Sequence, residues 1–140
     1  MKRADIVNEA RKYVGVSRWQ RMGRTPKGLD CYGLVILVRK AFGLKSEDWQ
    51  RYETYPVNAD FMGPGNRMFT QVHPPFKDGQ LIVFQQKGRP VHMGITCTDK
   101  YERRAVIHCA ANHRVCNEEV LEGALMQHFR ALFDFPGIED

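Results

Sequence analysis

The sequence predicts one α+β domain, residues 1–140, in which helices come first and antiparallel strands follow. Two observations predict this class. Apolar residues recur at helical spacing in the first third of the chain, and they alternate with polar residues in short segments after residue 78. With 140 residues, 43% of them hydrophobic, the chain is long enough to bury a core of its own.

The first predicted helix covers residues 3–14. Its apolar side chains, from Ile6 to Val14, share one face, and Gly15 is a suitable end. Glycine and proline residues interrupt the segment that follows, residues 16–28. We therefore expect an irregular loop there.

The second predicted helix begins at a cysteine. Asp30 is a good N-cap, because its carboxylate accepts hydrogen bonds from the N–H groups of the first turn. An apolar run with helical spacing follows Cys31, and Gly43 supplies a left-handed stop. The positive end of the helix dipole favours a thiolate at Cys31. This setting indicates a nucleophile, although a buried structural cysteine has the same appearance in a sequence.

The rest of the chain is predicted to be an irregular excursion followed by strands. Residues 44–76 contain many prolines and glycines, and a long excursion of that kind often acts as a lid or a binding wall. We expect five strands and a short helix after it, namely strands within residues 78–86, 91–97, 102–110, 114–120 and 128–135, with the helix at 121–127.

Two histidines fall on neighbouring predicted strands. If their hairpin loop is centred on Lys100, His92 lies directly opposite His108 on the same face, with Cβ atoms about 5 Å apart. A slip by one residue would put the rings on opposite faces, which the apolar pattern resists. A thiol activated by an imidazole that a third polar residue orients is the general arrangement of thiol catalysis. We therefore expect Cys31 to be the nucleophile, His92 its general base and later acid, and His108 the residue that orients His92.

The same histidines also fit a metal site, for which the local candidates are His108, Cys109, His113 and Cys116. Cys109 points away from His108 along a strand, and the spacing matches no zinc signature. We therefore expect no metal and no cofactor. The four cysteines include no CxxC pair, which argues against a disulfide framework.

Three sequence blocks resemble, in order and spacing, those of the NlpC-type cysteine peptidases: DCYGLVILV (30–38), DGQLIVF followed by VHMGI (78–95) and VIHCA (106–110). These are papain-like enzymes that cut stem peptides of the bacterial cell wall. The resemblance implies a papain-like fold, with the nucleophile helix packed on an antiparallel sheet. It implies the same roles for Cys31, His92 and His108, and cleavage of peptidoglycan at the γ-D-glutamyl to diamino-acid bond.

The lead-in RMGRTPKGLDC and the ending FRALFDFPG resemble the compact, phage tail-associated members of that family. This implies a tail-tip component that helps to penetrate the cell wall, with peptidoglycan and other tail-tip proteins as partners. It also implies assembly in the host cytoplasm before incorporation into the virion. Two alternatives stay open: a structural tail-tip protein with little or no activity, and an acyltransferase or amidase that uses the same thiol chemistry.

Three residues near the cysteine are expected to contact the substrate: Trp19, Asp30 and Tyr32. Family members often have serine where this chain has Tyr32, and a tyrosine near the position of Trp19. Trp19 is either a packing anchor or a wall of the cleft that leads to Cys31.

Charge and hydropathy exclude other classes. The formal net charge of +5 favours an anionic partner, which a cell-wall polymer and nucleic acid both satisfy. The aromatic residues are not interleaved with lysine and arginine as a base-stacking surface requires, so we expect no nucleic-acid partner. No run of about 18 apolar residues predicts a membrane span, and the charged start does not resemble a signal peptide.

Overall fold

The computed structural model describes residues 1–46, 48, 68–86 and 91–140. Most of the segment predicted to form an irregular lid or wall, residues 44–76, lies outside these residues. None of the helices among the described residues has the length and apolar character needed to cross a membrane.

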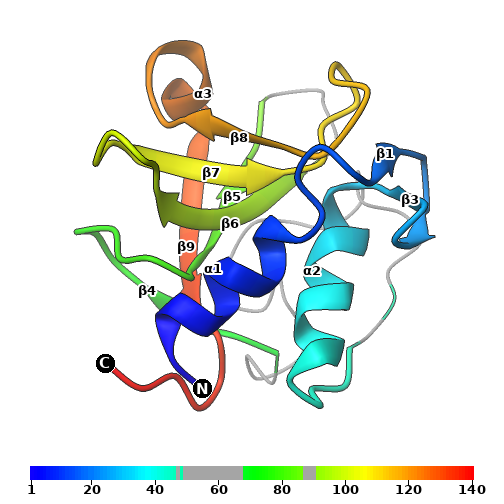
Figure 1. Ribbon diagram of the computed structural model, residues 1–140. Helices are drawn as coiled ribbons and strands as arrows, with labels where there is room; N and C mark the ends of the chain where they lie inside the picture. Colours follow the sequence, from blue (N-terminus) through cyan, green and yellow to red (C-terminus); the bar gives the residue numbers. More distant parts are fainter. Residues whose placement is uncertain (47, 49–67, 87–90) are drawn as a thin grey trace.

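The main described elements follow the predicted order: two helices come before the main sheet, and a short helix precedes its last strand (Figure 1). The described helices are α1 (Arg3–Arg11), α2 (Cys31–Ala41) and α3 (Gly123–Gln127). The described strands are β1 (Arg18–Trp19), β2 (Arg24–Thr25), β3 (Gly28–Leu29), β4 (Thr70–Val72), β5 (Leu81–Phe84), β6 (His92–Thr98), β7 (Arg104–His108), β8 (Asn117–Val120) and β9 (Phe129–Asp134). The α+β class is thereby confirmed.

The main sheet has six strands in the order β4-β9-β5-β6-β7-β8, and every neighbouring pair is antiparallel. Figure 1 shows α1 and α2 side by side on one face of this sheet, and both contact β6. The alternation along β5 explains how both faces are covered. Leu81 and Val83 join the core beneath the two helices, whereas Ile82 and Phe84 join a smaller cluster that includes Leu125 of α3. The sheet is therefore buried on both sides at its centre.

The α2 helix begins and ends as its sequence predicts. The Asp30 side chain accepts a hydrogen bond from the Gly33 N–H at 2.8 Å, which caps the first turn. Leu34, Val35 and Val38 are fully buried in the core. Gly43 has a φ of +72°, the left-handed conformation that a helix stop requires. The cap fixes the start of the helix, and so the position of Cys31.

Two parts of the chain contain more structure than predicted. The expected loop at residues 16–28 contains β1, β2 and the first residue of β3, and these three strands form a small sheet of their own. Its glycines serve close approach of backbones, because a Cβ on Gly23 would lie 2.3 Å from the Gly28 carbonyl oxygen. The segment 44–76 contains β4, which pairs with β9 at the edge of the main sheet. Strands of two or three residues carry too little periodicity to be recognised in a sequence.

The hairpin between β6 and β7 has a register two residues away from the predicted one. Ile95 pairs with Ile107, so Gly94, rather than His92, lies beside His108. The turn causes this shift: the Glu102 N–H donates to the Asp99 carbonyl, and Glu102 adopts a φ of +64°. A shift by two residues preserves the faces, so both histidines remain on the same side of the sheet.

Candidate active site

Cys31 lies at the start of α2, against the beginning of β6. Its thiol is within 3.9 Å of the Val91 carbonyl oxygen, and the backbone N–H of Met93 also points to the sulfur. These two residues flank His92 in the sequence. The fold therefore brings the Cys31 thiol against the backbone on both sides of His92. Only 6% of the surface of Cys31 is exposed.

Burial changes the expected ionisation of this thiol. It raises the pKa of Cys31 to about 12, and the neighbouring Asp30 carboxylate acts in the same direction. The backbone N–H groups of Met93 and Tyr32 lower the pKa, but they do not compensate. The prediction that the helix dipole favours a thiolate here is therefore wrong for the free protein, because desolvation outweighs the dipole. At neutral pH the resting group is a thiol.

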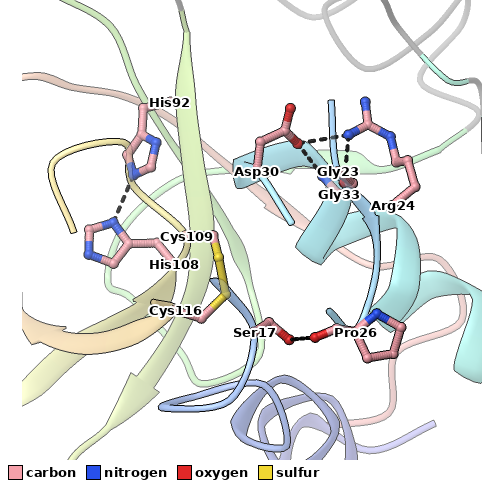
Figure 2. The surroundings of a disulfide bond; sticks show 10 residues. All are labelled: Ser17, Gly23, Arg24, Pro26, Asp30, Gly33, His92, His108, Cys109 and Cys116. Carbon is pink, nitrogen blue, oxygen red and sulfur yellow. Dashed lines mark hydrogen bonds and ion pairs between the residues drawn. A yellow bond between two sulfur atoms is a disulfide. The ribbon is translucent and has the colours of Figure 1, made fainter. Parts of the chain in front are cut away.

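His92 and His108 are directly hydrogen-bonded. The Nε2 atom of His92 and the Nδ1 atom of His108 are 2.7 Å apart. Figure 2 shows this hydrogen bond as a dashed line. The His92 ring also stacks against Phe84, with ring centroids 6.0 Å apart. The sequence prediction that these two imidazoles meet on one face of the sheet is thus confirmed, although they meet diagonally and not directly across the ladder. A diagonal pair on neighbouring strands is within reach of rings of this size.

The environment keeps His92 neutral. Burial lowers its pKa, and the nearby His108 and His113 act in the same direction, so that the pKa of His92 falls to about 3. Burial also lowers the pKa of His108, although the carboxylate of Glu119 opposes this change. A neutral imidazole can accept a proton, whereas an imidazolium cannot. His92 is therefore in the protonation state of a base throughout the physiological pH range.

Glu119 extends this chain and was missed by the sequence reasoning. Its Oε1 lies 3.1 Å from His108 Nε2 and 3.2 Å from His113 Nε2. The signal for it was the alternation along β8, where Glu118 points the other way and pairs with Arg11. This alternation shows that the two adjacent glutamates face opposite sides of the sheet. Only the pairing of β8 with β7 decides which of them faces the histidines.

The carboxylate determines where the protons of both imidazoles lie. An ionised carboxylate only accepts hydrogen bonds, so His108 must carry its proton on Nε2. Its Nδ1 is then an acceptor, and His92 must donate to it from Nε2. The remaining nitrogen of His92, Nδ1, is left with a free lone pair. Glu119 therefore selects, through His108, the one tautomer of His92 whose Nδ1 can take a proton from a thiol.

The three predicted substrate contacts lie in different environments. Asp30 is buried, and besides capping α2 it accepts hydrogen bonds from the Met22 N–H and from the Arg24 guanidinium, the latter at 2.8 Å. Tyr32 is fully buried beneath Arg24. The structure thus gives Asp30 and Tyr32 a role in holding the loop before α2. Their contact with a substrate stays a prediction that their burial does not favour.

Trp19 is half-buried and lines a cavity of about 500 Å³. The other lining residues are Arg18, Ala111, Asn112, His113, Arg114 and Val115. The cavity therefore adjoins the outer end of the histidine and glutamate chain. This position fits Trp19 as a wall of a binding cleft, which remains a prediction.

A disulfide joins Cys109 to Cys116 (Figure 2), a pair that the argument against a disulfide framework did not foresee. The two residues follow β7 and precede β8, and the antiparallel pairing of these strands brings them together. Sequence spacing alone did not reveal that proximity. The bond also removes both sulfur atoms from the metal-ligand set considered from the sequence, while His108, His113 and Glu119 remain as possible ligands.

Comparison with known proteins indicates the same family that the sequence blocks resemble. The sequence profile of the NlpC/P60 family matches residues 16–132. The NlpC/p60 domain of the peptidoglycan hydrolase SagA has a similar structure, with a TM-score of 0.69 and 20% identity over 96% of this chain and 100% of that one.

A protein from Staphylococcus aureus subsp. aureus Mu50, described as similar to lipoprotein and of the NLP/P60 family, has a TM-score of 0.59 and 18% identity. That match covers 99% of this chain and 42% of the other. At these identities the likeness establishes the fold. No curated protein sequence matches this chain.

Proposed function

Because the chain belongs to the NlpC/P60 family, we propose that it is a thiol peptidase that cuts peptidoglycan stem peptides at the γ-D-glutamyl to diamino-acid bond. The observation that carries the proposal is the hydrogen-bonded chain from His92 through His108 to Glu119, together with the contact of the Cys31 thiol with the carbonyl of Val91, the residue before His92. The domain of similar structure in SagA comes from a peptidoglycan hydrolase, which supports the substrate class. The net charge of +5 suits an anionic wall polymer.

The first step transfers a proton and forms a bond together. Since both groups are neutral at rest, the Cys31 thiol loses its proton to His92 Nδ1 as its sulfur attacks the peptide carbonyl carbon. The carbonyl becomes an oxyanion, for which the backbone N–H of Cys31, at the start of α2, is a suitable donor. The positive charge that develops on His92 is stabilised through His108 by the Glu119 carboxylate.

The second half returns the enzyme to its starting state. The His92 imidazolium gives its proton to the leaving amine, the carbon–nitrogen bond breaks, and an acyl group remains on the sulfur. A water molecule then loses a proton to His92 and attacks the thioester, and the proton returns to the departing sulfur. In these steps Cys31 and His92 are the catalytic residues, whereas His108 and Glu119 position His92.

Mass spectrometry of a peptidoglycan digest tests this proposal. The wild-type protein should release shortened stem peptides, each with one water added across the cut bond, and Cys31→Ala should abolish the release. Cys97→Ala is the matched control, since Cys97 is the other free, buried cysteine among the described residues. Equal digestion by Cys31→Ala would contradict the mechanism, and transfer of the acyl group to another amine would favour the acyltransferase alternative.

We also propose, on the resemblance of the lead-in RMGRTPKGLDC and the ending FRALFDFPG, that the protein is a phage tail-tip component. It would be assembled in the host cytoplasm with other tail-tip proteins and act after incorporation into the virion. Peptide mapping of purified particles tests this, because the chain should be found in the tail fraction. If wild-type particles need the protein for assembly, yet the protein leaves several wall chemotypes intact, the structural alternative is favoured.

A further inference from the structure

Three side chains at the outer end of the proposed site already have the spacing of metal ligands. His108 Nε2 and His113 Nε2 lie 3.1 and 3.2 Å from the same oxygen of Glu119, and the three ligand atoms all lie within 4.8 Å of one another. In a tetrahedral zinc site with bonds of about 2.0 to 2.1 Å, ligand atoms are about 3.3 Å apart. A Zn²⁺ ion therefore fits between these atoms with small adjustments.

The cluster is both accessible and held in place. The side chains of His113 and Glu119 are 37% and 39% exposed, whereas that of His108 is only 3% exposed, so a cation can enter from solvent and reach the interior histidine. The disulfide between Cys109 and Cys116 closes the loop that carries His113. Within that loop the His113 N–H donates to the Ala110 carbonyl at 3.0 Å. The ligands are thus arranged before any cation arrives.

We propose that His108, His113 and Glu119 bind Zn²⁺, or a divalent cation of the same ligand preference, and that the bound cation inactivates the thiol. Two imidazoles and one carboxylate are a known zinc ligand set that leaves the fourth position to water. The inactivation rests on the proposed peptidase function. The binding of the cation does not.

The proton positions explain the inactivation. Zn²⁺ binds His108 Nε2 in place of the proton that this atom carries in the free protein. His108 stays neutral, and its single proton is then on Nδ1. This Nδ1–H must now donate to His92 Nε2, which reverses the 2.7 Å hydrogen bond between the rings. His92 then carries its own proton on Nδ1, the atom that would take the proton of the thiol.

The change is balanced in protons and involves no electron transfer. One proton leaves His108 Nε2, the proton of His92 Nε2 crosses to His108 Nδ1, and one proton is taken up at His92 Nδ1. His113 likewise moves its proton from Nε2 to Nδ1 through solvent. The enzyme with the cation bound therefore has the same residues in place, but its base is in the wrong tautomer.

Calorimetric titration with Zn²⁺ tests the binding. The protein to use is Cys31→Ser, in which the thiol cannot hold the metal. One Zn²⁺ per chain is expected. Adding His113→Gln should weaken binding at least about tenfold, since even loss of an outer partner of a ligand costs about 10- to 100-fold. His73→Gln, which removes an exposed histidine elsewhere, should not change it. Absence of binding, or equal weakening by both changes, would overturn the site.

Nitrogen NMR of the Cys31→Ser protein tests the reversal of the hydrogen bond. Without metal, His92 should be protonated on Nε2, and at saturating Zn²⁺ it should be protonated on Nδ1. A His92 tautomer that does not respond to bound Zn²⁺ would overturn the inactivation mechanism, even where the binding itself is found.

Rates of peptidoglycan digestion complete the test. Zn²⁺ should inhibit the wild-type protein, and a chelator should restore it. The Zn²⁺ concentration that halves the rate of His113→Gln, relative to its own metal-free rate, should be at least about tenfold higher than that for the wild-type protein. Equal inhibition of both would overturn the proposal. A wild-type protein that is inert without metal would instead contradict the peptidase function, and the titration would then decide the metal site alone.

Discussion

His108 reaches His92 because the residue beside it on β6 is Gly94, which has no side chain. A Cβ on Gly94 would lie 2.5 Å from Val106 Cγ2 and 3.0 Å from His108 Cβ. The space left by this glycine lets the two rings meet diagonally at 2.7 Å, although the strands are shifted by two residues from a direct pairing. The contact on which the proposed mechanism depends therefore requires a position without a side chain.

Gly94→Ala is expected to displace His108 and to lower the rate of peptidoglycan cleavage about 100-fold, the cost of misplacing a catalytic group by about 1 Å. The added methyl group should also destabilise the fold by about 1 to 3 kcal/mol. Gly137→Ala is the control for a general loss of stability. There the φ of +73° is unfavourable for alanine, but the added Cβ meets nothing within 4 Å. Equal rates in the two variants would contradict the role of Gly94.

Glu119→Gln tests the selection of the His92 tautomer. The amide can still meet His108, but it has no charge and can also donate, so both tautomers of His92 become accessible. We expect kcat/KM to fall about 10²-fold, the low end of what a general base contributes. Nitrogen NMR should show a mixture of His92 tautomers. Glu118→Gln, on the opposite face of β8, should leave both measurements unchanged, and a similar loss in that variant would refute the assignment.

The stability of the protein should fall on acidification between about pH 6.5 and pH 3. His92 titrates near 6.5 in the unfolded chain, whereas in the folded protein its pKa is lowered to about 3. Within this window the unfolded state binds the extra proton, so the free energy of unfolding decreases by up to about 1.4 kcal/mol per pH unit for this group. Denaturant unfolding at pH 7 and pH 5 measures the decrease. His92→Gln should reduce the slope, and an unchanged slope would show that other groups cause it.

Alkylation of the free protein should be slow at neutral pH. Because burial and Asp30 raise the pKa of Cys31 to about 12, few molecules carry the reactive thiolate at pH 7. The rate of Cys31 modification by iodoacetamide, followed by peptide mass spectrometry, should rise steadily with pH up to at least pH 9. A plateau below pH 7 would show instead that Cys31 and His92 form a thiolate–imidazolium pair at rest.

Much of the fold could be predicted from the sequence because its signals are local. Asp30 before an apolar run, with Gly43 after it, defined the helix that begins at Cys31. The alternation of apolar and polar residues fixed which face of β6 and β7 each side chain occupies, so the meeting of His92 and His108 was foreseen despite the shifted register.

Other features were decided only by tertiary contacts. The choice of Glu119 over Glu118, the pairing of Cys109 with Cys116, and the cluster with His113 all depend on how β8 lies against β7. The raised pKa of Cys31 depends on how deeply α2 is packed against β6.

The sequence by itself thus determined the helices, the longer strands and the shared face of His92 and His108, because spacing along one element is enough to set a face. The tertiary structure decided which polar groups touch, where their protons lie and whether the thiol is charged. Hydrogen-bond partners and burial come from segments far apart in the chain, and no local pattern records them.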